Sequence, residues 1–461
     1  MKGFVPTPPD IVDLMVGKLF RARAPGNEAS VLDPGCGNGE FVEGILRACA
    51  ANGWAVPRIV GVELDPFRAA AAQRRFRAVP QVEIRHTDFL RPSNETFDFV
   101  IGNPPYVAIT GLSPAERIEY RSVYLTATGR FDLYVLFFEQ ALRLLAPRGR
   151  LVFITPEKFL YVETARPLRG LLCRHQVDEL HFAGEATFGD RVTYPLISTV
   201  TTRRGANSTR IIRRNGSVSK VTIGTSASWL PLIEGFALPA SPTTRTLADV
   251  AVRISCGVAT GADSVFVVPT VDLSAELMPF AHPTVSGRQI TPSHELVLKS
   301  SLLAPYDADG RLLPERQLGA LGRFLGEDER RQQLEGRTCV AHKPWYAFHD
   351  NLPLADILRP KLLCKDITEE PFFVVDHSGH LVPRHSVYYI VPADPVDLEP
   401  LAQYLNSGEA RSWLRAHCQR AANGFLRLQS HILKQLPVPA EFQGRGKNLA
   451  AQSLQAELLP V

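Results

Sequence analysis

Two kinds of hydrophobic segment alternate in the first part of the chain. Short apolar runs have the length of β-strands, and they lie at Ala29–Leu32, Arg58–Glu63, Val82–His86, Phe97–Ile101 and Arg150–Thr155. Longer stretches of helical pattern separate them, at Phe41–Ala51, Pro66–Arg77 and Leu133–Leu145. Strands that alternate with helices favour a parallel sheet with right-handed crossover connections. The pattern therefore predicts an α/β fold.

Further elements follow the fourth strand of this pattern. The run Pro147-Arg148-Gly149 predicts the end of the last helix before the fifth strand. Two more apolar runs, Val177–Phe182 and Leu196–Thr202, predict two additional strands of the same sheet.

The pattern changes near a segment rich in Pro, Ser and Thr, Ala237–Thr246, which we interpret as a linker. Beyond it, strand-like pieces mix with a charged helical stretch at Gly326–Glu335, and the pieces lie at Val265–Val268, Pro371–Val375 and Ser386–Ile390. Pro400–Gln435 has a helical pattern. We therefore predict a domain over residues 1–236, a mixed α+β domain over 247–440, and a polar tail over 441–461.

Composition supports two domains in a soluble protein. A chain of 461 residues is too long for one ordinary core, and 45% hydrophobic with 21% charged residues is typical of globular proteins. No apolar run reaches the roughly 20 residues of a membrane helix, and MKGFVPTPPD is no signal peptide. We expect a cytoplasmic protein with no membrane partner. Seven cysteines without a CxxC pair disfavour a disulfide framework or a metal site.

A glycine-rich turn follows the first predicted strand, in VLDPGCGNG at residues 31–39. Gly35, Gly37 and Gly39 allow a sharp turn and a close approach of a ligand to the backbone. The next two predicted strands end in Glu63-Leu64 and Asp88-Phe89. A carboxylate at the end of the second strand can accept both ribose hydroxyls of a nucleoside. Asp88 can accept a hydrogen bond from an adenine amine, and Phe89 can pack on the adenine ring.

The bland alternative is that Asp33, Glu63 and Asp88 merely end strands and cap helices. Their place at three successive strand ends favours a nucleoside site instead. A dinucleotide brings a pyrophosphate, which prefers an open helix N-terminus without acids. This loop has Asp33 before the glycines and Glu40 after them, and two acids suit a cationic ligand better. We therefore predict S-adenosylmethionine, whose sulfonium and amino group are cationic.

The fourth predicted strand runs into Asn103-Pro104-Pro105-Tyr106. An exocyclic amine on an aromatic ring is a poor nucleophile because its lone pair is delocalised. The Asn103 side-chain oxygen and the Pro104 carbonyl can each accept one of its protons, while the two prolines stiffen the turn. Catalysis then needs positioning and electrostatics rather than a general base. Tyr106 offers a flat face for the target ring. The alternative is an ordinary turn.

In this order, PTPPDIVDLM, DPGCGNG, GVELD, TDF, NPPY and FDLYVLFFEQALRLLAPRGRLVFITP resemble the gamma-class DNA adenine methyltransferases of the TaqI type. The likeness covers most of residues 1–205 and, more weakly, the C-terminal part. It implies a Rossmann-like class I S-adenosylmethionine-dependent methyltransferase domain, a C-terminal target-recognition domain, and methylation of an adenine flipped out of duplex DNA.

The resemblance also implies residue roles. Thr7, Asp33, Glu63, Leu64, Asp88, Phe89, Asn103 and Pro105 would hold the cofactor together with the glycines of the turn. Asn103 and Pro104 would grip the amine, and Tyr106 would stack on the base. Phe188, in the segment GEATF at residues 184–188, would close over the flipped adenine. That segment has one more residue than its counterpart in the TaqI enzyme, and the alternative role for Phe188 is a core residue.

A base inside a duplex must be extruded at a cost of a few kcal/mol, so we assign DNA recognition to residues 247–440. Several cationic and aromatic side chains there are candidates for contacts with phosphates, base edges or sugars: Arg288, Lys343, Trp345, Tyr346, Arg359 and Lys361. For each, a solvated charge or a core aromatic is the competing interpretation.

Three other functions compete with this one. A glutamine methyltransferase of release factors also uses NPPY, and an RNA base methyltransferase poses the same activation problem. A non-catalytic DNA-binding subunit should have lost Asn103 or the glycine turn, and both are intact. Without a nuclease-like acidic cluster, we expect a methyltransferase that acts in a restriction-modification or related defence system, with a separate cognate endonuclease as a candidate partner.

Overall fold

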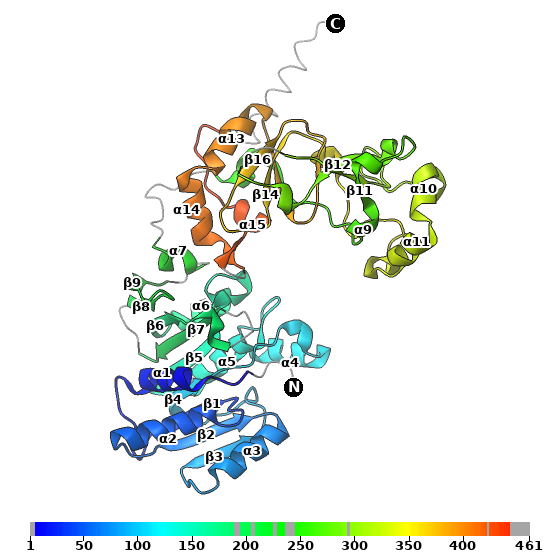
Figure 1. Cartoon of the computed structure of the whole chain (residues 1–461). Helices are drawn as coiled ribbons and strands as arrows, with labels where there is room; N and C mark the ends of the chain where they lie inside the picture. The colour runs from blue at the N-terminus through cyan, green and yellow to red at the C-terminus, as the bar shows by residue number, and fades with distance from the viewer. Residues whose placement is uncertain are drawn as a thin grey trace. The chain divides into compact units, whose positions relative to one another are not determined.

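The computed structural model describes residues 5–188, 194–203, 208–224, 228–235, 245–292, 296–421 and 424–442. The chain divides into two compact units, residues 1–235 (unit 1) and residues 236–461 (unit 2) (Figure 1). Most of the predicted linker, residues 237–244, and residues 443–461 of the predicted tail lie outside the described residues. The roles assigned to the parts, cofactor chemistry and target recognition, stay predictions.

Unit 1 is built on one sheet with the strand order β3-β2-β1-β4-β5-β7-β6-β8-β9. β1 to β5 are parallel, and β7 runs antiparallel to both of its neighbours. The strands are β1 Ser30–Pro34, β2 Arg58–Glu63, β3 Val82–His86, β4 Phe97–Gly102, β5 Leu145–Pro156, β6 Gln176–Phe182, β7 Pro195–Thr201, β8 Ser208–Ile212 and β9 Val218–Thr222. The helices are α1 Pro9–Phe20, α2 Glu40–Asn52, α3 Pro66–Phe76, α4 Pro114–Val123, α5 Leu133–Arg143, α6 Arg166–Leu172 and α7 Leu230–Ile233.

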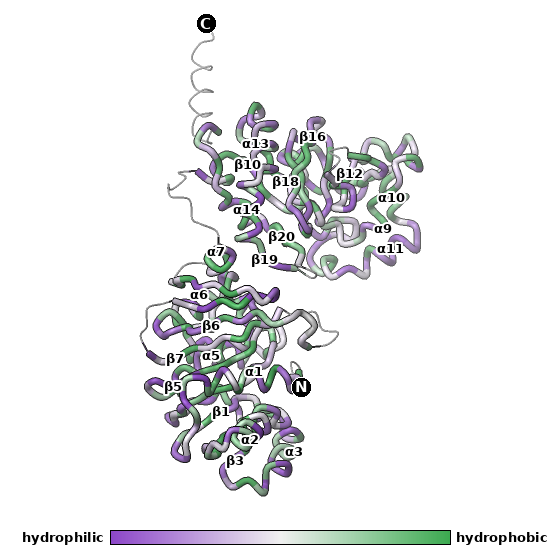
Figure 2. The backbone as a smooth tube through the Cα atoms, turned by 60° about the vertical axis from the view of Figure 1, so that its left-hand side comes forward, coloured by the Kyte–Doolittle hydropathy of each residue, from purple (hydrophilic) through white to green (hydrophobic). Residues whose placement is uncertain are grey.

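Helices cover both faces of this sheet because neighbouring strand residues point to opposite sides. Val31 packs in one core, which includes apolar residues of α1 and α2, while Leu32 packs in another, which includes most of α5. Val152 and Phe153 divide in the same way. A parallel sheet buried on both faces has continuous apolar strands rather than alternating ones. Figure 2 shows hydrophobic stretches along the middle of unit 1 and hydrophilic stretches mainly in its loops.

The α/β fold and the seven strands predicted in this part of the chain are confirmed, with boundaries shifted by a few residues. One prediction is wrong: Pro147-Arg148-Gly149 does not lie between the helix and the strand. α5 ends at Arg143, and β5 already begins at Leu145. The pairing of β5 with β4 shifts register between Phe97 and Phe99, and Arg148 has a φ of 64°. The Pro-Arg-Gly run therefore forms a bulge inside β5.

Unit 2 contains three small sheets among its described residues, with the orders β10-β18-β14-β16, β11-β13-β12-β17 and β15-β20-β19. Their strands are β10 Ala251–Cys256, β11 Val267–Pro269, β12 Ala281–Val285, β13 Ser300–Leu303, β14 Lys361–Lys365, β15 Ile367–Thr368, β16 Phe373–Asp376, β17 Val382–Pro383, β18 Val387–Pro392, β19 Gln419–Arg420 and β20 Leu426–Arg427. The helices are α8 Leu247–Val250, α9 Asp263–Phe266, α10 Gly319–Leu325, α11 Asp328–Glu335, α12 Leu354–Ile357, α13 Leu398–Leu405, α14 Gly408–His417 and α15 Ser430–Leu433.

The mixed α+β character predicted for unit 2 is confirmed, but two of its elements differ from prediction. Val265–Val268 is divided between the end of α9 and the start of β11. Within Pro400–Gln435, the short strands β19 and β20 interrupt the helices. Each of these strands is only two or three residues long, so tertiary pairing rather than local pattern decided its conformation. Among the described residues, no helix has the length and hydropathy required to cross a membrane.

Candidate active site

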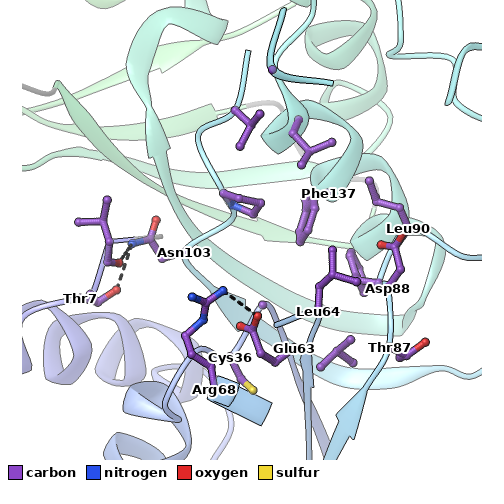
Figure 3. A pocket seen from close by; sticks show the side chains of 18 of the residues that line it. Thr7, Cys36, Glu63, Leu64, Arg68, Thr87, Asp88, Leu90, Asn103 and Phe137 are labelled. Carbon is purple, nitrogen blue, oxygen red and sulfur yellow. Dashed lines mark hydrogen bonds and ion pairs between the residues drawn. The ribbon is translucent and has the colours of Figure 1, made fainter. Parts of the chain in front are cut away.

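A cavity of about 390 Å³ lies at the carboxyl ends of the central strands of unit 1 (Figure 3). The strand order reverses between β1 and β4: β2 and β3 are added on one side of β1, and β4 and β5 on its other side. Ligands of open α/β sheets bind at such switch points. The cavity volume is in the range of small-molecule sites. The N-terminal segment at Val5–Thr7 completes its wall.

The glycine turn after β1 is held against the end of β2. The backbone N–H groups of Gly35 and Cys36 both donate to the Val62 carbonyl, at 2.7 and 2.9 Å. Gly39 has a φ of 90°, and a Cβ there would lie 2.2 Å from the Phe76 ring. Only glycine fits this position, so α2 can begin directly at the cavity.

Glu63, at the end of β2, organises the floor of the cavity. One carboxylate oxygen accepts from the Gly37 N–H at 3.0 Å, and the other accepts from the Asp65 N–H at 2.7 Å and from Arg68 at 3.0 Å. Its side chain is buried yet lines the cavity. Each carboxylate oxygen can accept more than one hydrogen bond, so capacity for a ligand hydroxyl remains on this anion.

Asp88 and Phe89 follow β3 and line the cavity. Figure 3 shows Asp88 on the side of the cavity opposite Asn103. The Asp88 carboxylate accepts from the Leu90 N–H at 2.9 Å, which fixes the turn after the strand. The Phe89 ring packs against Phe137 of α5 with centroids 5.0 Å apart. These groups form an apolar slot with one carboxylate at its edge, which suits a purine ring with an exocyclic amine.

The cavity lining is negatively charged. It contains four carboxylates, on Glu40, Glu63, Asp88 and Glu116, against one guanidinium, on Arg68. Beneath it lies the fully buried Asp33, and neither of its carboxylate oxygens has a hydrogen-bond partner among the described residues. Burial, with Glu40 and Glu63 nearby, raises the pKa of Asp33 well above its usual range. A cationic ligand would offset this excess of acid, so the residues fit S-adenosylmethionine better than a pyrophosphate cofactor.

Asn103 is oriented by the N-terminal segment rather than by its own strand. Its side-chain nitrogen donates to the Val5 carbonyl and to the Thr7 hydroxyl, both at 3.2 Å (Figure 3). Both N–H donors of the carboxamide are thereby occupied, so its oxygen is the group left to accept a hydrogen bond. The same cavity is lined by Gly35 and Asn103, so the glycine turn and the Asn-Pro corner share one open space.

Two aromatic rings lie beside this corner. The Tyr106 hydroxyl donates to the Ile154 carbonyl at 3.3 Å, and burial raises the pKa of this phenol. Phe188, in the short 3-10 helix Glu185–Phe188, stands edge-on to Tyr106 with centroids 6.4 Å apart and an interplanar angle of 82°. Phe188 also packs in the core that includes α1, so its position agrees with both interpretations given to it.

Most of the predicted cofactor residues line the cavity: Thr7, Gly35, Glu63, Leu64, Asp88, Phe89, Asn103 and Pro105. The other predicted site residues do not line it: Asp33, Gly37 and Gly39 of the cofactor set, and Pro104, Tyr106 and Phe188 of the catalytic set. Sequence reasoning missed Arg68, Phe137 and Tyr120, which also line it. Arg68 lies on the helix that follows the GVELD motif, and Phe137 lies within the quoted motif that begins at Phe131, whereas α4, which carries Tyr120, had no signal.

Two of the residues predicted to contact DNA are structural. Lys361 has no exposed side-chain surface and forms an ion pair with Asp376 at 2.6 Å. Tyr346 is 5% exposed and donates its hydroxyl to the Leu313 carbonyl within the core of unit 2. Burial of both side chains favours the competing interpretation, a structural role, over contact with DNA.

The remaining candidates in unit 2 differ in how firmly they are held. The Lys343 ammonium donates to the carbonyls of Phe348 and His349 and to the Asn351 side chain, which ties a loop together. Trp345 donates to Glu315 and carries Arg331 over its ring. Arg359 is half-buried, whereas Arg288 is exposed. Of the six, Arg288 is the most accessible cation.

Comparison with known proteins points to one group of enzymes. Residues 59–188 match the model of the Eco57I restriction-modification methylase family. The chain is 29% identical to Type II methyltransferase M.PaeR7I of Pseudomonas aeruginosa, over 95% of this chain and 86% of that protein. It is also 29% identical to Type II methyltransferase M.XhoI of Xanthomonas vasicola, over 76% of this chain and 70% of that protein.

A solved structure with a similar fold is the Type IIL restriction-modification enzyme MmeI in complex with DNA. Its TM-score is 0.66 at 14% identity, over 98% of this chain and 67% of that one. The comparisons confirm the predicted resemblance to restriction-modification methylases and the predicted methyltransferase fold. They also support methyl transfer, with S-adenosylmethionine as the cofactor that the acidic cavity fits.

Proposed function

We propose that this methyltransferase of the restriction-modification kind modifies the exocyclic amino group of an adenine flipped out of a specific sequence in duplex DNA. One observation carries the proposal: both N–H donors of the Asn103 carboxamide are occupied by Val5 and Thr7. The Asn103 oxygen is therefore held as an acceptor at the cavity that fits the cofactor.

The proposed mechanism rests on two hydrogen bonds to the target amine. The Asn103 oxygen accepts one N–H proton and the Pro104 carbonyl accepts the other. Both bonds draw electron density back onto nitrogen, which can then become pyramidal and nucleophilic. Because donor and acceptor groups are set before the substrate arrives, little reorganisation is needed during the reaction. S-adenosylmethionine, when bound, supplies an electrophilic methyl group on a sulfonium.

Other residues of the chain would hold the two reactants. Glu63 would accept the ribose hydroxyls of the cofactor, and Asp88 its adenine amine, while Phe89 and Phe137 would enclose the ring. Tyr106 would stack on the target base, and the edge-on Phe188 would limit its position. The excess of carboxylates around the cavity supports a cationic ligand there. The proton lost from nitrogen leaves to solvent after transfer, so no general base is required.

Adenine and DNA are supported by different observations. The Asn-Pro-Pro-Tyr corner would activate an exocyclic amine, and both adenine and cytosine carry such an amine. The resemblance to the gamma-class enzymes favours adenine. DNA is favoured by the similar fold of MmeI, a restriction-modification enzyme solved in complex with DNA. The match to a restriction-modification methylase family favours a cognate endonuclease that cuts the unmethylated form of the same sequence.

The test is transfer of radiolabelled methyl groups from S-adenosylmethionine to duplex DNA, to RNA and to release-factor protein. Digestion of the labelled product to nucleosides, followed by mass spectrometry, distinguishes N6-methyladenine from N4-methylcytosine. We expect N6-methyladenine in duplex DNA at one short sequence. Label only in RNA or protein would refute the DNA assignment, and N4-methylcytosine would refute the choice of base.

A further inference from the structure

Unit 2 has a surface groove of about 620 Å³, and Arg288 is the one of its lining residues that the sequence predicted as a DNA contact. Three short segments line it, residues 286–288, 365–367 and 384–386, together with Asp263. The first lies after β12, the second runs from the end of β14 to the start of β15, and the third lies between β17 and β18. Binding residues are frequently carried on loops that a rigid scaffold positions.

Backbone hydrogen bonds hold the three segments in one arrangement. The Asp366 N–H donates to the Ser386 carbonyl and the Arg384 N–H to the Val285 carbonyl, each at 3.0 Å. The Gly287 N–H donates to the Ser386 hydroxyl, also at 3.0 Å. A Cβ on Gly287 would meet the Ser386 carbonyl oxygen at 3.0 Å, so these chains approach closely. The groove is therefore preorganised.

Some of the cationic side chains that line the groove have no anionic partner among the described residues. Its two acids already have partners: Asp263 accepts from Thr260 at 2.6 Å and faces Arg384 at 3.5 Å, and Asp366 faces Arg427 at 3.7 Å. In the described part of the chain, no carboxylate forms an ion pair with Arg288 or Lys365. Two cations thus remain available for an anionic ligand or for acceptors on a base edge.

One apolar side chain lies among these cations. Ile367 is 43% exposed and belongs to the segment 365–367, which lines this charged groove. An exposed β-branched residue beside two free cations matches what a duplex offers in its major groove. There, guanine presents two hydrogen-bond acceptors and thymine presents a methyl group. The phosphate oxygens of the backbone flank the groove.

On the basis of the proposed function, we infer that this groove contacts the target duplex. Arg288 and Lys365 bind phosphate oxygens or guanine acceptors, and Ile367 packs against a thymine methyl group or a sugar. Arg384 serves mainly to hold the rim, because Asp263 engages its guanidinium. The inference adds Lys365 and Ile367 as specificity-determining or positioning residues, and it retains Arg288.

The experiment begins with the full-length wild-type protein and the sequence that it methylates in DNA from expressing cells. Duplexes with and without that sequence are then titrated with wild type, Arg288→Ala, Lys365→Ala and Ile367→Ala at several salt concentrations. We expect each cation variant to bind about 10-fold more weakly and to lower the salt slope by about one. Ile367→Ala should lose about 3-fold, with an unchanged salt slope.

Arg316→Ala is the matched control, because Arg316 is also exposed, also lies in a short 3-10 helix of unit 2, and does not line the groove. Lys365→Arg should restore most of the affinity, and cofactor affinity should stay at the wild-type value in every variant. Groove variants that match Arg316→Ala in affinity, salt slope and methylated sequence would overturn the inference. A wild-type protein that methylates no DNA would instead overturn the proposed function.

Discussion

The two units differ in how well the site residues that were predicted from the sequence come together in the structure. In unit 1, residues far apart in the chain, from Thr7 to Pro105, line one cavity. In unit 2, candidates were chosen for charge or aromatic character within segments that resemble target-recognition regions, and they include Lys361 and Tyr346, which are buried structural residues. Motif residues, many of them at strand ends, thus came together in unit 1, whereas the candidates in unit 2 did not.

The difference has a physical origin. Parallel strands end at one edge of a sheet, so their last residues are neighbours wherever they lie in the sequence. No such rule relates a lysine in one small antiparallel sheet to an arginine in another loop. A lysine in an apolar strand is as useful for pairing a buried carboxylate as for binding a phosphate. Each prediction below tests one side of this contrast.

The largest expected effect concerns the buried pair of unit 2. Lys361→Ala leaves Asp376 buried without its partner, which should lower the free energy of unfolding by about 3–5 kcal/mol. Lys365→Ala, four residues along the same strand and without an ion-pair partner, should change it by about 0.5 kcal/mol or less. Urea denaturation followed by tryptophan fluorescence measures both. A stable Lys361→Ala protein with weakened DNA affinity would restore the original assignment of Lys361.

How far the sequence could predict the molecule depends on the same contrast. The alternation of apolar runs was sufficient for the central sheet, because a sheet buried on both faces requires such runs. It was misleading at Pro147-Arg148-Gly149, where a bulge absorbs the residues that usually separate two elements. Burial of Lys361 was not predictable, because its partner Asp376 becomes a neighbour only through strand pairing.

In the candidate site, the sequence indicated which residue types were needed but not how they are held. Asn103 was identified from its motif, yet the contacts that orient it come from Val5 and Thr7, at the start of the chain. Arg68 pairs with Glu63 across a turn, and no spacing rule distinguished it from the other arginines of α3. Contacts of this kind depend on tertiary structure, which local patterns do not encode.

The second prediction concerns Asn103 itself. Asn103→Ala removes the acceptor for one amine proton, so turnover should fall about 10²–10³-fold, or about 2.7–4 kcal/mol, by analogy with loss of one preorganised hydrogen-bonding group. Cofactor affinity should change little. Single-turnover methylation assays and calorimetric cofactor titration separate the two quantities. Asn52→Ala, at an exposed position at the end of α2, is the control. Unchanged turnover in Asn103→Ala would exclude the proposed mechanism.

The third prediction tests the opposite side of the cavity. Asp88→Ala should weaken cofactor binding by about 1.5–3 kcal/mol, because a hydrogen bond to a charged group is lost. Turnover at saturating cofactor should stay close to wild type. Glu119→Ala removes an exposed carboxylate from α4 outside the cavity lining and should leave cofactor affinity unchanged. Equal affinities for the two variants would show that Asp88 does not contact the cofactor.

The fourth prediction separates ring from hydroxyl at Tyr106. Tyr106→Ala should weaken binding of the target duplex by about 1–3 kcal/mol, since base–aromatic stacking is lost. Tyr106→Phe keeps the ring and loses only the bond to the Ile154 carbonyl, so its duplex affinity should lie close to wild type. Affinity is measured with a duplex that carries a mismatch at the target adenine. If Tyr106→Phe and Tyr106→Ala weaken duplex binding equally, the hydroxyl rather than the ring contributes to duplex affinity.

The smallest expected effect tests whether a distant segment orients the catalytic side chain. Thr7→Val keeps the shape of the buried side chain but removes the acceptor for the Asn103 nitrogen. One neutral hydrogen bond contributes about 0.5–1.5 kcal/mol, so kcat should fall roughly 2- to 10-fold while the KM for DNA changes little. Thr7→Ser retains the hydroxyl and should recover most of that loss. If Thr7 had a purely structural role, Thr7→Val would lower the free energy of unfolding, and Thr7→Ser would not recover kcat. If serine and valine have the same kcat, Asn103 is held by Val5 and its own turn alone, and the N-terminal segment only closes the cavity.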